Sequence, residues 1–96
     1  MKDKKNYNYA FLFYDVKEKR VQKVFKICKK YLTHFQYSVF RGEMTPSKLI
    51  QLKKELKKVI DENEDFICII KLINSNVYGE DILGSRPDTD GENLII

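Results

Sequence analysis

The chain has 96 residues, of which 43% are hydrophobic, 33% charged and 12% aromatic. This length predicts a single domain, since most domains contain about 100–150 residues. No apolar run approaches the roughly 20 residues of a membrane-spanning helix, and the N-terminus lacks the apolar segment of a secretory signal. Two separated cysteines and one histidine argue against a disulfide framework or a zinc site, and we expect a cytoplasmic protein.

The formal net charge of +4 conceals a strong asymmetry along the chain. Residues 1–60 carry 16 Lys and Arg against 5 Asp and Glu, whereas residues 61–96 carry 2 against 9. A basic segment of this kind predicts contact with a polyanion such as nucleic acid. The alternative is a solvated surface whose two oppositely charged ends attract each other.

The first half of the domain alternates between strand and helix patterns. Residues 1–8 predict a flexible polar extension, and residues 9–96 predict one folded domain. Tyr7–Val16 is aromatic and apolar on both faces, which predicts a buried central strand that ends at Asp15. Lys17–Leu32 then follows the helical period, with an apolar stripe on one side and lysines on the other.

The next segment, Thr33–Met44, is extended again. Adjacent Val39 and Phe40 break its alternation, which predicts two short antiparallel strands that meet near Ser38. Thr45 and Pro46 then have the residue types of a helix N-cap and first helical position. The leucines that follow predict the buried face of a second basic helix.

After this helix, residues 61–65 form an acidic turn. Phe66–Ile73 predicts a second strongly buried strand, and Val77–Leu83 a weak one. The apolar end, Asn93–Ile96, predicts a last strand paired with a sheet edge, because exposed apolar tails are a liability. The order strand, helix, strand, strand, helix, strand predicts an α+β, ferredoxin-like domain with an extra C-terminal strand.

Asp15 is the first candidate for chemistry, since a carboxylate at a strand end can hold Mg²⁺ through oxygen ligands. One carboxylate is a poor site by itself, but two copies of Asp15 in a two-fold dimer could share a hydrated ion. The alternative is that Asp15 is a cap or turn residue before the helix. The sequence leaves both interpretations open.

The remaining reactive side chains give weaker signals. Ser38 is a candidate nucleophile, but neither it nor His34, which we expect in a loop or on the surface, lies in a triad pattern. Tyr14, Tyr37 and Phe40 have rings that could stack on bases, although aromatic residues in strands more often belong to the core. Both cysteines are expected to be small core residues. Phosphate-binding loops, dinucleotide fingerprints and RNA-recognition motifs are absent from the sequence.

Several of these segments, taken in order, resemble the CRISPR-associated protein 2 family. Tyr14-Asp15-Val16 closes the first strand, and Arg20-Val21 opens the basic helix. Residues 36–43, Gln-Tyr-Ser-Val-Phe-Arg-Gly-Glu, are similar to the family's Gln-x-Ser-Val-Phe-x-Gly-x segment. A Thr-Pro-Ser helix start, the strand at Phe66–Leu72 and the terminal Asn-Leu-Ile-Ile follow. The resemblance covers nearly all of residues 7–96, with Arg41 standing where an acidic residue is common.

The resemblance implies a homodimer in which the C-terminal strand pairs with the partner's sheet. It implies a scaffold that holds duplex DNA between dimers of the CRISPR-associated protein 1 integrase during spacer acquisition. It also implies an Mg²⁺-dependent endonuclease acting on RNA or DNA, with Asp15 as the metal-binding and catalytic residue.

Two classes of function therefore remain open, a metal-dependent nuclease and a non-enzymatic DNA-binding scaffold, with a toxin-like small ribonuclease of related fold as a further alternative. Candidate nucleic-acid contacts are Lys17, Lys19, Arg20, Lys23 and Arg41, and candidate supporting residues are Tyr14, Ser38 and Phe40.

Overall fold

The computed structural model describes residues 7–74 and 79–84 of the chain. The elements follow the predicted order: β1 (Tyr9–Asp15), α1 (Glu18–Tyr31), β2 (Thr33–Gln36), β3 (Val39–Glu43), α2 (Pro46–Val59) and β4 (Phe66–Leu72). Residues 79–83, part of the predicted weak strand, are irregular. The predicted terminal strand at residues 93–96 lies outside the described residues.

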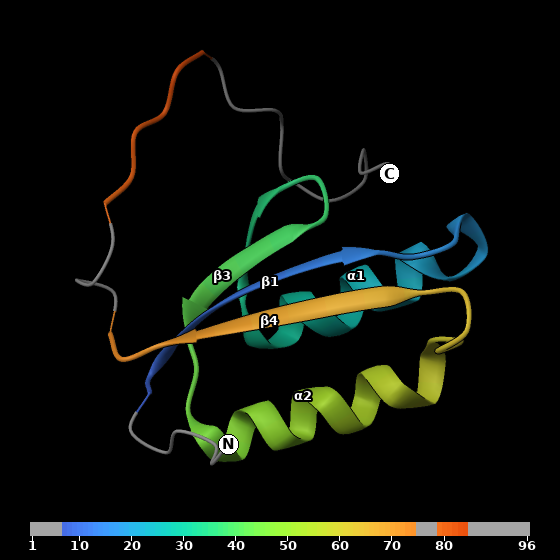
Figure 1. Cartoon of the computed structure of the whole chain (residues 1–96). Coiled ribbons are helices and arrows are strands. Elements are labelled where there is room, and N and C mark those ends of the chain that lie inside the picture. The colour runs from blue at the N-terminus through green and yellow to red at the C-terminus, as the bar shows by residue number, and fades with distance from the viewer. Residues whose placement is uncertain (1–6, 75–78, 85–96) are drawn as a thin grey trace.

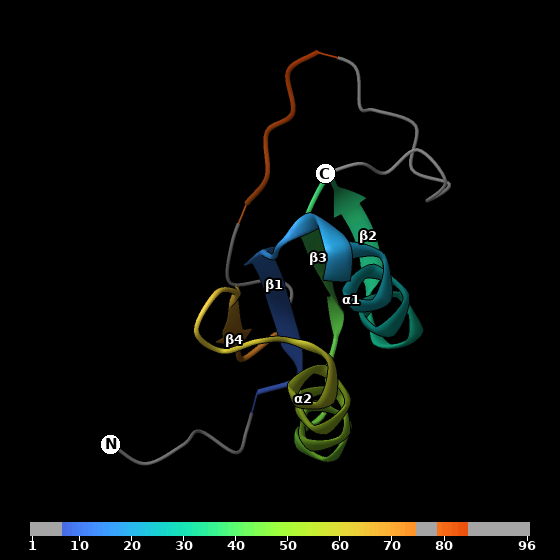
Figure 2. The same ribbon diagram turned by 90° about the vertical axis from the view of Figure 1, so that its right-hand side faces the viewer.

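The four strands form one antiparallel sheet in the order β2-β3-β1-β4. Strand β1 is central, with Phe11 opposite Arg41 of β3 on one side and Ile70 of β4 on the other. Both helices lie on the same side of this sheet (Figures 1 and 2). This arrangement confirms the predicted α+β, ferredoxin-like fold. None of the helices among the described residues is long and apolar enough to cross a membrane.

The core lies between the sheet and the two helices, because alternate residues of β1 point toward them. Ala10, Leu12 and Tyr14 of β1 are buried in this layer. The helices complete it with apolar residues at helical spacing, which are Val24, Phe25, Cys28, Leu49, Leu52 and Leu56. Helix α2 begins as predicted, since the Thr45 hydroxyl accepts the Lys48 amide at 3.2 Å and Pro46 follows.

The turn between β2 and β3 falls at Tyr37 and Ser38, where the sequence predicts it. Tyr37 has a left-handed backbone with φ of 44°, and its carbonyl lies 2.7 Å from Nε2 of His34. The imidazole ring of His34 packs against Phe25 and Phe40, with ring centroids 4.8 Å and 5.0 Å apart. His34 is therefore a partly buried residue of β2 that packs the hairpin against the core, and the prediction of a loop or surface position is wrong.

The sheet face opposite the helices is apolar and uncovered among the described residues. Phe13, Phe66 and Ile70 remain 37%, 56% and 47% exposed. The prediction that Phe66–Ile73 is a strongly buried strand is wrong, since β4 lies at the sheet edge with most of its residues only partly buried. An apolar run fits both a strand buried on two faces and a strand with one open apolar face. Open apolar patches of this kind commonly mark interaction surfaces.

Two residues of the predicted extension contact the sheet. Tyr7 is only 5% exposed, and the Asn8 amide donates to the Leu72 carbonyl at 3.1 Å. The Met44 amide donates in turn to the Asn8 carbonyl at 3.0 Å. Tyr7 and Asn8 therefore extend the pairing of β1 beyond its first residue.

Candidate functional site

Asp15 is the last residue of β1 and is exposed. By the alternation of the strand, its side chain shares the open sheet face with Phe11 and Phe13. Its backbone lies opposite Phe66, the first residue of β4. The carboxylate therefore stands at one corner of the uncovered apolar face, accessible to solvent and to a partner.

One protomer contributes few ligands for a metal ion. Among the residues that the structure describes, no group of three or more His, Cys, Asp or Glu side chains could hold one. An exposed carboxylate fits a hydrated Mg²⁺, which keeps several waters and often binds through one or two carboxylates and the substrate's phosphates. Asp15 fits such an ion as one of its ligands.

Close behind Asp15, the side chain of Asp65 is completely buried and accepts hydrogen bonds from Arg20 and from two backbone amides. Nε and Nη2 of Arg20 lie 2.6 Å from Oδ2 and 3.1 Å from Oδ1. The backbone amides of Lys17 and Asp61 donate at 2.9 Å each, to Oδ1 and Oδ2. We call Asp65 and these donors the Asp65 cluster. It joins the start of α1 to the turn between α2 and β4.

The charges in this cluster stabilise each other. The Arg20 guanidinium holds the pKa of the Asp65 carboxyl well below its usual range, against the opposing effect of burial, and the two backbone amides add to the shift. Hydrogen bonds to Asp65 and then Glu64 raise the pKa of Arg20 further above its already high value. Glu64 is peripheral, since its side chain is 45% exposed and contacts only Nη2 of Arg20, at 2.8 Å.

The sequence did not predict the Asp65 cluster. It identified residues 61–65 as an acidic turn and Arg20 as a candidate phosphate contact, but no local pattern links residues that are 45 positions apart. The single signal available was an arginine in the first turn of the helix that follows β1, together with an aspartate directly before the strand that pairs with β1.

The side chains predicted to contact nucleic acid differ in whether they already have a carboxylate partner. Lys17, Lys19 and Lys23 are exposed at the start of α1. The Arg41 guanidinium pairs with Glu80, with Nη1 2.6 Å from both carboxylate oxygens, and lies 4.2 Å from the centroid of the Phe35 ring. Arg20 and Arg41, the two arginines among the predicted contacts, therefore already have carboxylate partners.

More lysines extend the basic surface over both helices. Those exposed beyond Lys23 are Lys26, Lys29 and Lys30 on α1 and Lys48, Lys53, Lys54, Lys57 and Lys58 on α2. Lys30 forms an ion pair with Glu55 at 2.5 Å, and the Tyr31 hydroxyl also donates to Glu55. These contacts connect the two helices. Their outer surface is rich in cations and poor in anions.

The candidate supporting residues belong mostly to the core. Phe40 is fully buried and Tyr14 is 6% exposed, with ring centroids 6.2 Å apart. The Ser38 carbonyl accepts the Tyr14 amide at 3.2 Å, so Ser38 closes the hairpin beside β1. Of the two interpretations that the sequence leaves open for these rings, packing in the core agrees with their burial. Burial also raises the pKa of the Cys28 thiol to about 12, as expected for a small core residue. The same prediction is wrong for Cys68, which is only partly buried and lies opposite Phe13 on the open sheet face.

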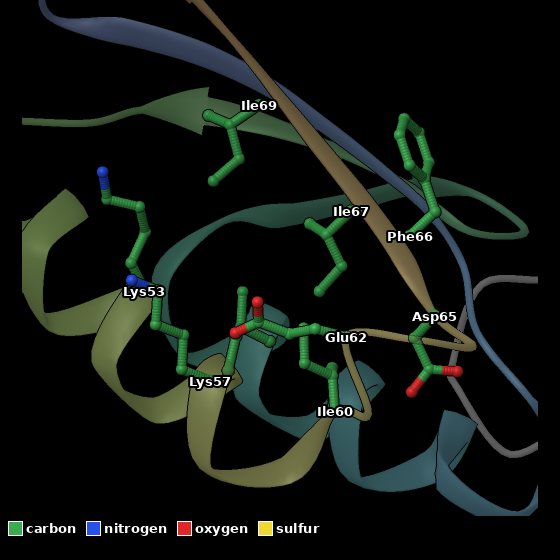
Figure 3. Close-up of a pocket in the computed structure, with 9 residues that line it drawn as sticks. Lys53, Lys57, Ile60, Glu62, Asp65, Phe66, Ile67 and Ile69 are labelled. Carbon is green, nitrogen blue, oxygen red and sulfur yellow. The ribbon is translucent and has the colours of Figure 1, made fainter.

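A groove of about 290 Å³ runs between α2 and the edge strand β4 (Figure 3). Leu56, Ile60, Ile67 and Ile69 give it apolar walls, and Lys53 and Lys57 also line it. Asp65 is among its lining residues, whereas Asp15 is not. The groove is therefore separate from the exposed carboxylate.

Residues 8–79 match the family described as CRISPR associated protein Cas2. The chain belongs to the Cas2 family. Among its relatives, a protein of Thermotoga maritima named CRISPR-associated endoribonuclease Cas2 is 41% identical over 86% of this chain and 95% of that protein. A protein of Thermodesulfovibrio yellowstonii, named CRISPR-associated endoribonuclease Cas2 3, is 43% identical over 90% of this chain and 98% of its own.

A solved structure titled "Crystal structure of cas2" also superposes on this Cas2-family protein. The TM-score is 0.76 at 31% identity, and the match covers 94% of this chain and 99% of the other. The resemblance drawn from the sequence motifs is therefore confirmed, and family membership favours a CRISPR-associated protein over the toxin-like ribonuclease alternative.

The buried Asp65 predicts a specific loss of stability in acid. The pKa of an aspartate in an unfolded chain is about 3.9. The pKa of Asp65 in the folded protein is lower. Its contribution is therefore complete above about pH 5 and is lost as the pH falls toward the folded pKa. We expect the free energy of unfolding to decrease below about pH 4 and Asp65→Asn to lose part of this dependence. Urea unfolding at several pH values measures this free energy, with a substitution of the exposed Glu62, Glu62→Gln, as the control. If Asp65→Asn loses as much stability in acid as the wild type, Asp65 is not the group responsible.

Proposed function

We propose that this protein is a dimeric scaffold that binds duplex DNA and acts with the CRISPR-associated protein 1 integrase in spacer acquisition. The observation that carries the proposal is the basic outer surface of α1 and α2. Family membership supports a role in a CRISPR system, and the charge distribution supports a polyanionic ligand.

Lysines along two adjacent helices suit contacts with a phosphate backbone. Lys17, Lys19 and Lys23 are exposed at one end of α1, and each carries a mobile point charge with three donors. Such contacts release counterions and carry no base preference, as a scaffold for many different sequences requires. Of the three candidate stacking rings, Tyr14 and Phe40 are buried, whereas Tyr37 is 58% exposed and is the one that could stack on a base.

Arg20 and Arg41 remain predicted phosphate contacts, but each would first have to leave a carboxylate partner. Arg20 would have to release Asp65 or Glu64, and Arg41 would have to release Glu80, before either could turn fully to a phosphate. Exchange at Arg41 is the easier of the two, because Glu80 lies on an irregular segment whereas the Asp65 side chain is buried.

A second copy of the chain is the partner that best fits the open sheet face. Phe13, Phe66 and Ile70 would leave water on contact with an identical face, and a two-fold axis would oppose the same residues. The edge of β4 offers further backbone groups for an added strand. The predicted exchange of residues 93–96 between protomers would use this edge.

The basic surface predicts a steep dependence of duplex DNA binding on salt. Replacing Lys17, Lys19 and Lys23 together with Gln should reduce the slope of log K against log salt by about 0.9 for each phosphate that the protein no longer neutralises. Affinity should fall alike for unrelated sequences. Fluorescence anisotropy of a labelled duplex at several salt concentrations measures both effects.

Lys71→Gln is the control: it removes one positive charge, against three in the triple variant, and takes it from β4, where the Lys71 ammonium lies 5.2 Å from the centroid of the Tyr7 ring, instead of from α1. It should leave the salt slope unchanged. An equal decrease in slope in the control and the triple variant, or affinity independent of salt, would contradict the proposed surface.

A second candidate function is metal-dependent cleavage of phosphodiesters, favoured by the exposed carboxylate at the end of β1. Asp15 would hold Mg²⁺, which in nucleases activates water and neutralises charge on the phosphate. The chain's own contribution is to fix Asp15 at a strand end, to leave it open to substrate, and to oppose it to a second Asp15 across the dimer. Basic side chains nearby would hold the phosphodiester in reach.

Asp15→Asn separates the two functions, because it keeps the size of the side chain and removes its charge. The fold should survive, since this residue is exposed. Mg²⁺-dependent cleavage of labelled RNA and duplex DNA should fall by about a hundredfold or more, while DNA affinity stays equal or rises slightly. Spacer integration with the integrase should persist.

The measurement pairs a cleavage assay with an integration assay for both proteins. Undiminished Mg²⁺-dependent cleavage by the variant would remove Asp15 from the catalytic role. Loss of integration, with the dimer and DNA binding intact, would contradict the scaffold as a function independent of Asp15.

A further inference from the structure

The Asp65 carboxylate is unusual among the charged groups in the described part of the chain. Its side chain has no exposed surface, whereas the carboxylates of Glu55, Glu64 and Glu80 in the other ion pairs are 33%, 45% and 30% exposed. Burying a charge is costly unless it is paired and fully hydrogen-bonded, and Asp65 meets both conditions. Such a group is expected where local geometry must be fixed.

The cluster adjoins the end of β1 through Lys17 and Phe66. Asp65 precedes Phe66, whose backbone is opposite that of Asp15. Oδ1 of Asp65 accepts the amide of Lys17, only two residues after Asp15. In the close-up of Figure 3, Asp65 is at the start of β4, beside the first turn of α1. The end of β1 is thus held by two contacts: the pairing of Asp15 with Phe66, and the hydrogen bond from the Lys17 amide to Asp65.

We propose that Asp65, acting through Arg20 and the Lys17 amide, is a positioning residue that fixes the backbone at Asp15 for the nuclease reaction. The inference rests on the proposed catalytic role of Asp15. Asp65 itself touches neither substrate nor metal, because it is buried.

The direction of the Asp15 side chain depends on the backbone that carries it. Val16 and Lys17 are the only residues between β1 and α1, so a shift of the Lys17 amide moves the end of the strand. A misplacement of about 1 Å can reduce catalysis by about a hundredfold when a group must meet a substrate in a fixed geometry. Arg20 keeps Asp65 charged and oriented. Its main role is therefore to hold the backbone near Asp15, more than to contact phosphate.

Three single variants test the proposal. Asp65→Asn keeps the shape of the side chain and removes its charge. Glu64→Gln is the matched control, since it is the adjacent residue, loses the same charge and pairs with the same Arg20, but is half-exposed. Asp15→Asn reports on the proposed nuclease itself. All are assayed as full chains at a temperature at which circular dichroism shows each to be folded.

Two readouts are measured for each variant. The first is hydrogen exchange of the amides of residues 16–20, which is independent of activity. In Asp65→Asn, exchange at Lys17 should accelerate by about tenfold, because its amide loses a charged acceptor. The second is Mg²⁺-dependent cleavage, in which kcat should fall by about tenfold to a hundredfold while KM stays within about twofold. Glu64→Gln should match the wild type in both.

The outcomes separate the two claims. If Asp15→Asn is inactive but Asp65→Asn matches Glu64→Gln in both exchange and kcat, the positioning role is overturned and the proposed nuclease stands. If Asp15→Asn cleaves like the wild type, the catalytic role of Asp15 fails, and the positioning role fails with it.

Should Asp65→Asn not fold, the double variant Arg20→Gln and Asp65→Asn replaces it. Two amides then face each other and no buried charge is left unpaired, so the fold is favoured. The same exchange and kcat changes are expected from the double variant, and wild-type values in both would overturn the proposal.

Discussion

Strand β1 is the element on which both sides of this molecule depend. Its alternation sends Ala10, Leu12 and Tyr14 into the core beneath the helices and sends Phe11, Phe13 and Asp15 to the open face. A shift of register by one residue would exchange these two sets and place a carboxylate toward the core. Pairing with β3 on one side and β4 on the other prevents that shift. The same backbone thus buries the core and presents Asp15.

The order and type of the elements could be predicted from the sequence because local signals agree. The helical stripe of α1, the Thr45-Pro46 start of α2 and the interruption near Ser38 each depend on neighbouring residues, and each agrees with the structure within a residue or two. The environment of β4 could not be predicted, since whether an apolar run is covered depends on layers contributed by other parts of the chain or by a partner.

The candidate site divides in the same way. Asp15 could be singled out from sequence, because a carboxylate that ends an apolar strand breaks a pattern. Asp65 could not, because its burial depends on Arg20 and Lys17, which approach it only after the sheet and α1 have formed. The partners of Arg41 were hidden for the same reason. Charge counted along the chain therefore overstates how many cations are free to meet a polyanion.

In the proposed nuclease, one Asp15 from each protomer would make a shared site across the open face. Differently tagged wild-type and Asp15→Asn chains, co-expressed and purified through both tags, give a dimer with one intact carboxylate. If two carboxylates hold the metal together, this mixed dimer should show less than about a tenth of the wild-type Mg²⁺-dependent cleavage. Half of the wild-type rate would mean that each protomer acts alone and would contradict the shared site.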